Sequence, residues 1–156
     1  MTMRIKINFD FFDFSDIMHN VMAEAEGKIF SFDGTDKIRA DYLETFGYDG
    51  GEQLIEYSTD EFSAVCPFSG LPDIGRLVIR YIPQEKCLEL KSLKYYLISF
   101  RNVGVYQEKA TDIIFNDIKA ALQPRYLFIG LDYNIRGGIF AHTEMIYGEL
   151  PVKYQK

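Results

Sequence analysis

The segment QEKATDIIFNDIKAALQP (residues 107–124) decides the fold class of this chain. Its apolar residues recur at intervals of three and four and stop before a proline, as expected for an amphipathic helix. They are Ala110, Ile113, Ile114, Ile118, Ala121 and Leu122. The pattern predicts a helix over residues 107–122. A second helix is expected over residues 92–101, so the two helices are adjacent along the chain.

Strands are predicted on both sides of this helix pair. Residues 53–58, 76–82 and 86–90 precede it, and residues 125–133 and 139–146 follow it. Strands, then two adjacent helices, then strands indicate an α+β fold with a mainly antiparallel sheet and the helices on one face. Because the edge strands of a small sheet need to be paired or covered, we expect the chain to form an oligomer.

The N-terminal part of the chain has patterns of its own. Alternating apolar residues predict a strand over residues 3–11, and an apolar stripe after Ser15 predicts a helix that stops at Gly27. A short strand is expected over residues 28–33 and a helix over residues 35–46.

The composition is that of a globular domain. The chain has 156 residues, of which 47% are hydrophobic and 26% are charged, and this length predicts a single domain. A net charge of −6 argues against a basic surface for nucleic acid. Two cysteines and two histidines make neither a disulfide scaffold nor a structural zinc site, so no metal is expected. Without a membrane span or a signal peptide, a cytoplasmic location is the simplest expectation.

Cys66 is the first candidate for chemistry, because it opens the loop CPFSGLPD (residues 66–73). A lone cysteine is most often a small buried apolar residue, but loops rich in proline and glycine tend to carry functional side chains. Asp73 closes the loop and could fold back toward the thiol. A thiolate beside a protonated acid suits addition to an electrophilic carbon. The alternative role of Asp73 is to cap a turn.

The loop resembles the active-site loop of 7-cyano-7-deazaguanine reductases, the NADPH-dependent nitrile reductases of queuosine biosynthesis. The segment ELKSLKYY (residues 89–96) is similar to the signature of that family, and SFRN (99–102), QE (107–108) and RGG (136–138) follow in the family's order. Several specific motifs in the correct order are strong evidence. The resemblance covers residues of roughly 40–146. It divides the chain into an N-terminal extension, residues 1–39, and a reductase domain of the single-module type, residues 40–156.

The resemblance implies a tunnelling fold. In this fold a small antiparallel sheet with two helices assembles side by side with other copies into a barrel. It also implies a homo-oligomer, normally of two stacked rings, with the sites at subunit boundaries.

The resemblance also implies a mechanism. The Cys66 thiolate would add to the nitrile carbon to give a covalent thioimide, and Asp73 would protonate the nitrogen. NADPH would reduce the thioimide and then the imine to the aminomethyl product. Glu108 would hold the base through a bidentate pair, although a glutamate in the first turn of a helix is otherwise a surface residue. Further base contacts are implied for Leu88, Glu89 and Leu90.

The implied contacts to the NADPH phosphates are Lys91, Lys94 and Arg136, with Gly137 in the same turn as the arginine. Taken alone, these cations would be read as a solvated surface. The chain lacks the Gly-x-Gly-x-x-Gly pattern of a Rossmann site, so the cofactor would bind in another way.

Gln107 departs from the family, in which many members carry histidine before the glutamate. Glutamine can donate a hydrogen bond to substrate but does not titrate near neutral pH, which leaves Asp73 as the matching acid. His142 is expected to be structural, and Cys87 is expected to pack in a strand.

Two alternatives remain beside the reductase. One is an amidine-forming transferase that uses the same Cys–Asp addition on modified tRNA. The other is an oligomer of this fold that binds a purine or a partner without catalysis. The cations Lys91, Lys94 and Arg136 favour the reductase over the transferase. The presence of both Cys66 and Asp73 argues against a protein without catalysis.

Overall fold

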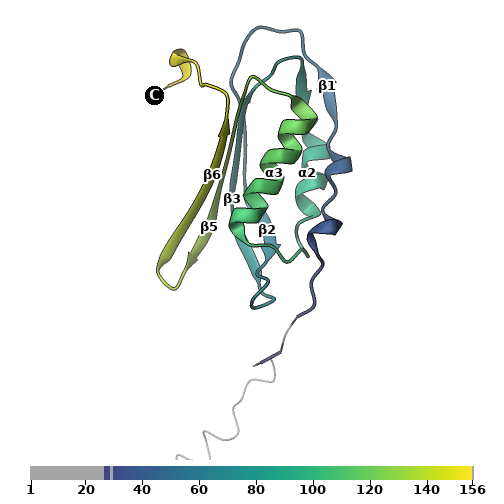
Figure 1. Ribbon diagram of the computed structural model, residues 1–156, viewed down its shortest axis with the longest axis vertical. Coiled ribbons are helices and arrows are strands. Elements are labelled where there is room, and N and C mark those ends of the chain that lie inside the picture. Colours follow the sequence, from purple (N-terminus) through teal and green to yellow (C-terminus); the bar gives the residue numbers. More distant parts are fainter. Residues whose placement is uncertain (1–26, 29, 156) are drawn as a thin grey trace, which may run out of the picture.

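The computed structural model describes residues 27–28 and 30–155, which form a four-stranded antiparallel sheet covered on one face by two helices (Figure 1). The strands of this sheet are β2 (Ile55–Val65), β3 (Pro72–Ile82), β5 (Tyr126–Arg136) and β6 (Ile139–Tyr147), in the order β2-β3-β5-β6. The helices are α2 (Leu90–Ile98) and α3 (Gln107–Leu122). The α+β prediction and the order of its elements are confirmed.

A second, two-stranded sheet lies beside the helices. It pairs β1 (Thr45–Gly47) with β4 (Lys86–Leu88) in antiparallel register. The helix predicted over residues 35–46 is wrong. The segment forms two single 3-10 turns, η1 (Thr35–Lys37) and η2 (Ala40–Tyr42), before it enters β1. Pairing with a distant strand has overridden the local helical pattern here.

The strand predicted over residues 28–33 is also wrong, because the described residues of this range, 28 and 30–33, form a single bridge, between Asp33 and Val103. The main chain of this region is nevertheless tied to the domain. Asp33 N donates to Asn102 O, and Arg39 N donates to the hydroxyl of Ser99. The predictions for residues 3–11 and 15–26 lie outside the described residues. A C-terminal 3-10 turn, η3 (Val152–Tyr154), ends the fold.

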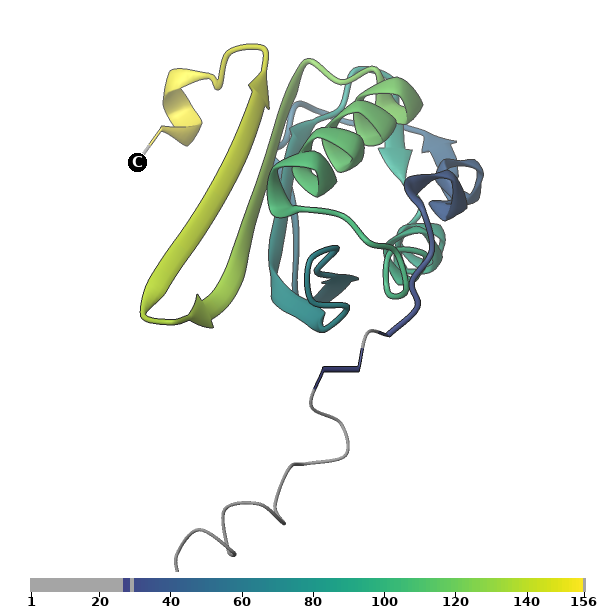
Figure 2. The same ribbon diagram turned by 60° about the horizontal axis from the view of Figure 1, so that its bottom comes forward.

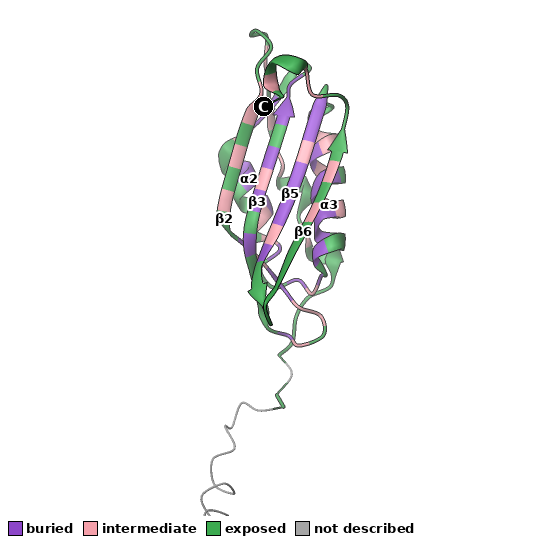
Figure 3. Ribbon diagram, turned by 90° about the vertical axis from the view of Figure 1, so that its left-hand side faces the viewer, coloured by how far each residue is buried: buried purple, intermediate pink, exposed green. Residues whose placement is uncertain are grey.

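The strands of the large sheet are longer than the sequence pattern predicts. β2 runs on through the polar residues Thr59, Asp60 and Glu61, and its register against β3 shifts between Thr59 and Phe62. An irregularity of this kind breaks the alternation of buried and exposed residues that identifies a strand. Figure 3 shows β3 and β5 as the more buried strands of the sheet and β6 as largely exposed.

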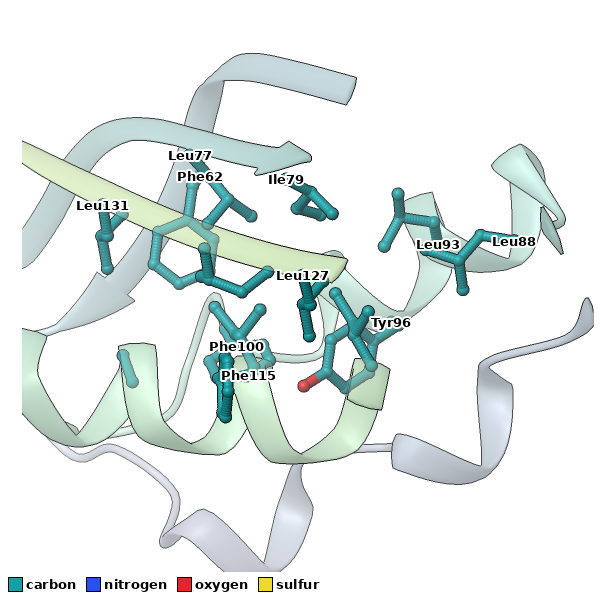
Figure 4. Close-up of a cluster of buried hydrophobic side chains, with 14 of the residues drawn as sticks. Phe62, Leu77, Ile79, Leu88, Leu93, Tyr96, Phe100, Phe115, Leu127 and Leu131 are labelled. Atoms are coloured by element: carbon teal, nitrogen blue, oxygen red, sulfur yellow. The ribbon is translucent and has the colours of Figure 1, made fainter. Parts of the chain in front are cut away.

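The hydrophobic core lies between the sheet and the helices. Alternate residues of the strands point into it, and α3 adds the stripe that its sequence predicts, including fully buried Ile114 and Ile118. Phe100, just after α2, lies 5.4 Å between ring centroids from both Phe62 and Tyr96 (Figure 4). This packing holds α2 against the sheet. None of the helices in the described part of the chain is both long and apolar enough to cross a membrane.

The topology gathers three parts of the chain at one end of the sheet. β3 begins there, directly after the loop from β2, and β5 ends beside it with Tyr133 opposite Gly75. Figure 2 shows this end, where the loop between β2 and β3 lies below the start of α3. These segments contain Cys66, Asp73, Glu108 and Arg136.

Candidate functional site

The loop between β2 and β3 brings Cys66 next to Asp73. Cys66 N donates to Leu71 O and Gly70 N donates to Cys66 O, both at 2.8 Å, which closes the loop on itself. The loop ends at residue 71 and not at residue 73 as predicted, because Pro72 and Asp73 already pair with Val65 and Ala64 of β2. The thiol and the carboxyl therefore stand at the two sides of one hairpin loop.

The Cys66 side chain is partly exposed, and its surroundings favour the thiolate. A hydrogen bond from the Ser69 side chain, helped by the backbone at Ser69 and Phe68, holds the pKa of the thiol below its usual value. Burial and the charge of Asp73 oppose this effect. A nucleophilic cysteine needs such local stabilisation, because the thiolate is the reactive form.

Asp73 is buried, with 5% of its surface exposed, and its side chain lies on the helix-covered face of the sheet. Burial raises the pKa of this carboxyl, because the charged form loses its hydration. The guanidinium of Arg136 contacts the carboxylate and partly offsets the rise in pKa. The net effect makes Asp73 a better proton donor than an exposed aspartate would be.

Tyr133 lies near Arg136 and Asp73. Its ring packs where Gly75 has no side chain, since a Cβ at residue 75 would come within 2.7 Å of Tyr133 Cδ1. The Arg136 guanidinium lies 5.8 Å from the centroid of the ring. Burial raises the pKa of the Tyr133 hydroxyl well above its usual value, and the charges of Asp73 and Glu108 add to the rise. The hydroxyl therefore keeps its proton at neutral pH.

The start of α3 supplies the next two residues. Gln107 is buried, and its Nε2 donates to Leu131 O at 2.6 Å and to Ala141 O at 3.2 Å. These bonds use both amide hydrogens of Gln107 to hold the helix against the sheet. Glu108, one residue on, is exposed in the first turn, where the helix dipole favours its negative charge.

The remaining predicted residues form a second group around the start of α2. Leu88 is buried, and Glu89 caps the helix by accepting hydrogen bonds from Lys91 N at 3.0 Å and Ser92 N at 2.7 Å. Leu90, Lys91 and Lys94 are exposed. Glu89 and Lys91 line a hollow of about 520 Å³ that also includes Tyr42 and Tyr95.

The two groups lie far apart within one chain. The main chain of Leu88 is bonded to the hydroxyl of Tyr81, near the end of β3, whereas Asp73 lies at its start. Eight strand positions separate these two residues of β3, which corresponds to roughly 27 Å. The structure thus gathers Cys66, Asp73, Glu108 and Arg136 but leaves Glu89 and Lys91 at the other end of the sheet.

His142 and Cys87 lie apart from the candidate site. The ring of His142 contacts Asp132 at 2.5 Å and Glu144 at 3.2 Å, and both carboxylates raise the pKa of the imidazole. This cluster is on the sheet face away from the helices, whereas Asp73 is on the covered face. Cys87 is buried, as predicted. Within residues 27–28 and 30–155, no three His, Cys, Asp or Glu side chains are grouped so that they could hold a metal ion.

Sequence reasoning missed the positions of Ser69 and Tyr133. Ser69 belongs to the quoted loop, but nothing in the sequence says that its hydroxyl turns back to Cys66. Tyr133 shares the strand parity of Leu131, so the alternation in β5 places it on the core face. The sequence signal that could have identified Tyr133 is a tyrosine at a buried strand position, three residues before Arg136.

Comparisons with known proteins identify relatives of this chain. The family model described as QueF-like protein matches residues 72–151. The chain is 57% identical over 125 residues to the NADPH-dependent 7-cyano-7-deazaguanine reductases of Thermotoga petrophila and Thermotoga maritima, covering 80% of this chain and 91% of each relative. It is 50% identical over 112 residues to the reductase of the same name from Caldanaerobacter subterraneus subsp. tengcongensis, covering 70% of this chain and 84% of that relative.

A solved structure shares the fold. It is the archaeosine synthase QueF-Like in the apo form, with a TM-score of 0.60 and 22% identity. The match covers 65% of this chain and 100% of that chain.

Proposed function

The chain belongs to the family of NADPH-dependent 7-cyano-7-deazaguanine reductases, and we propose that it reduces the nitrile of 7-cyano-7-deazaguanine to an aminomethyl group, in queuosine biosynthesis, through a covalent adduct on Cys66. The observation that carries this proposal is the pairing of Cys66 and Asp73 across one loop. The surroundings lower the pKa of the thiol and raise the pKa of the carboxyl. Each group is therefore shifted toward the protonation state that nitrile addition requires.

The first step is addition of the thiolate to the nitrile. A bond forms between Cys66 Sγ and the nitrile carbon, and one π bond of the C≡N group opens onto the nitrogen. Asp73 gives its proton to that nitrogen and becomes a carboxylate beside Arg136. The product is a thioimide. Splitting a difficult reduction into covalent addition and later steps lowers the barrier of each. NADPH, when bound, supplies the hydrides that convert the thioimide to the amine.

The exposed cations fit the phosphates of NADPH. Lys91 and Lys94 project from α2 and form no ion pair with any other described residue. Arg136 is mostly exposed despite its contact with Asp73. Gly137 follows it with a positive φ, in open space, so no side chain blocks an approaching ligand. Arginine suits bidentate phosphate binding, and lysine serves as a point charge.

Binding of the substrate base would use residues of both groups, the one around Cys66 and the one at the start of α2. Glu108 offers an exposed carboxylate near Cys66, able to accept the two adjacent N–H groups of a deazaguanine edge. Leu88, Glu89 and Leu90 lie at the other end of β3, beyond the reach of a base bound to Glu108. We propose that these residues come from a second copy of the chain, so that the site lies at a subunit boundary.

The sheet has two edges available for this assembly. β2 and β6 are its outer strands, and each pairs on one side only among the described residues. Unpaired strand edges favour association with another chain. Edge-to-edge pairing of several copies would close the barrel that the tunnelling fold implies, and two such rings would stack. The reducing cytoplasm would keep the Cys66 thiol free.

The test is adduct formation without NADPH. Incubation with 7-cyano-7-deazaguanine should add one nitrile per chain by intact mass and produce a thioimide absorbance band. Cys66→Ala should show neither change, whereas Cys87→Ala, the matched control, should show both. An adduct that survives Cys66→Ala, or no adduct in the natural protein, would overturn the proposal.

The second measurement is the NADPH consumed per amine formed. Two molecules per product are expected for the reductase. Ammonia incorporation without NADPH oxidation would instead indicate the amidine-forming transferase. Base binding without any adduct would indicate a protein that only binds a purine.

A further inference from the structure

The Tyr133 hydroxyl is the single buried side-chain polar atom without a hydrogen-bond partner in the part of the chain that the structure describes. Buried hydroxyls nearly always have a partner, because leaving one unsatisfied costs free energy. A group kept in this state next to a reactive cysteine requires an explanation.

The fold makes specific room for this tyrosine. Its ring lies against Gly75, and any larger residue there would collide with the ring and with the carbonyl of Asp132. The Arg136 guanidinium lies near the ring and contacts Asp73 at the same time. Tyr133, Arg136 and Asp73 therefore form one cluster, with the thiol of Cys66 and the carboxylate of Glu108 close enough to affect the pKa of the tyrosine.

Two neighbouring side-chain donors already have acceptors. Both amide hydrogens of Gln107 are donated to main-chain carbonyls, and Arg136 donates to Asp73. The proton of Tyr133 stays on its oxygen at neutral pH, because burial and nearby negative charges disfavour the phenolate. Tyr133 is thus a neutral donor for which residues 27–28 and 30–155 supply no acceptor.

We propose that the Tyr133 hydroxyl donates a hydrogen bond to the nitrile nitrogen while Cys66 adds to the nitrile carbon. The inference rests on the proposed function and adds a catalytic residue to it. As the new S–C bond forms, the nitrogen gains an electron pair that Asp73 protonates. Tyr133 keeps its own proton and stabilises the developing negative charge on the nitrogen. The bonds formed and broken are therefore those of the thiolate addition described above.

Access to the hydroxyl depends on Arg136. Its side chain is mostly exposed and lies against both Asp73 and the tyrosine ring. A shift of the guanidinium away from Asp73 would open the carboxyl and the hydroxyl together to the substrate. A donor held in place before the reaction needs little reorganisation when charge develops.

The test is Tyr133→Phe, which removes only the hydroxyl. Because that oxygen has no hydrogen-bond partner among the described residues, thermal stability should stay the same or rise. The rate of thioimide formation at saturating nitrile should fall about 100- to 1000-fold, the scale expected for one donor to a developing charge. The dissociation constant of the nitrile, measured in a Cys66→Ala background where no bond forms, should change less than about threefold. Tyr126→Phe, a buried tyrosine of the same strand, should leave the rate unchanged.

Two results would overturn the inference. One is a rate of thioimide formation within about twofold of the natural protein. The other is a loss that resides wholly in nitrile affinity, which would make Tyr133 a binding residue only. If the natural protein itself forms no adduct, the proposed function and this inference fail together, whereas a normal adduct in Tyr133→Phe removes the inference alone.

Discussion

Arg136 contacts Asp73 across 63 residues of sequence, joining the end of β5 to the start of β3. The family resemblance implies different ligands for these two residues, a phosphate of the cofactor for Arg136 and the nitrile for Asp73. Because the two side chains are in contact, the Arg136 guanidinium also affects the pKa of Asp73. Burial raises the pKa of Asp73 and Arg136 lowers it, so the position of Arg136 decides how far the carboxyl is protonated.

Removing the cation should therefore move the pH range of the first step. Asp73 acts as an acid only while it is protonated, and this form is lost as pH rises through its pKa. Arg136→Ala removes the opposing charge, so the pKa of Asp73 should rise further and thioimide formation without NADPH should persist to higher pH. Arg136→Lys, which keeps a positive charge, should retain most of the natural profile. An alkaline limb that does not move in Arg136→Ala would show that Asp73 does not limit the step.

Loss of the Ser69 hydroxyl should act on the nucleophile, and it should move the acidic side of the pH profile. Ser69→Ala removes the hydrogen bond that lowers the pKa of Cys66, so a smaller fraction of the thiol is ionised at neutral pH. Thioimide formation should slow at pH 7 and recover as the pH is raised. Ser69→Thr retains a hydroxyl and should behave more like the natural protein.

Alkylation by iodoacetamide measures the thiolate directly, without the nitrile. The pH at which Cys66 reacts at half its maximal rate should shift upward in Ser69→Ala. Cys87 is buried and should react slowly in both proteins, which provides an internal reference. An unchanged alkylation profile would mean that the Ser69 hydroxyl does not stabilise the thiolate.

Gly75 should be intolerant of even one added methyl group. A Cβ at this position would press on Tyr133 Cδ1 at 2.7 Å and on the carbonyl oxygen of Asp132. Because the main chain of a paired strand cannot move aside easily, Gly75→Ala should reduce the free energy of unfolding by about 1–3 kcal/mol. The measurement is the urea midpoint, with Gly47→Ala as the control, since no atom lies within 4 Å of a Cβ there. Equal midpoints would contradict the close packing at Gly75.

The fold was largely predictable from the sequence because its helices and strands carry clear periodic patterns. Helix α3 has the predicted bounds, and the order of the surrounding strands is as predicted. Residues 35–46 were mispredicted because a local pattern cannot reveal that residues 45–47 pair with a strand forty positions away. The predicted end of β2 was wrong for a similar reason, since an irregular register breaks the alternation.

The candidate site was predictable in its residue types and in the proximity of one pair of residues. Cys66 and Asp73 are close in sequence, so a short loop already indicated their proximity. The contact between Arg136 and Asp73 depends on β5 pairing with β3, which no local pattern contains. The turn of the Gln107 amide toward the sheet is likewise a result of tertiary packing.

The separation of the two groups of predicted residues leads to a test by mixing variants. Glu108→Ala removes a carboxylate from the group of residues that contains Cys66. It should weaken base binding by about 1.5–3 kcal/mol, the scale of hydrogen bonds to a charged group. Glu89→Gln removes the negative charge from the group at the start of α2, while the amide oxygen can still accept the capping hydrogen bonds of that helix. Each variant alone should be a poor reductase, measured by NADPH oxidation with the nitrile.

Unfolding and refolding the two variants together should restore part of the activity if two chains share each site. A hybrid boundary then combines intact Glu108 from one chain with intact Glu89 from the other. Refolding Glu108→Ala with Cys66→Ala is the matched control and should restore nothing, because both changes lie in the same group and no boundary regains a complete site. If the first mixture also stays inactive although each variant refolds and assembles as the natural protein does, Glu89 and Glu108 do not serve one base from two subunits.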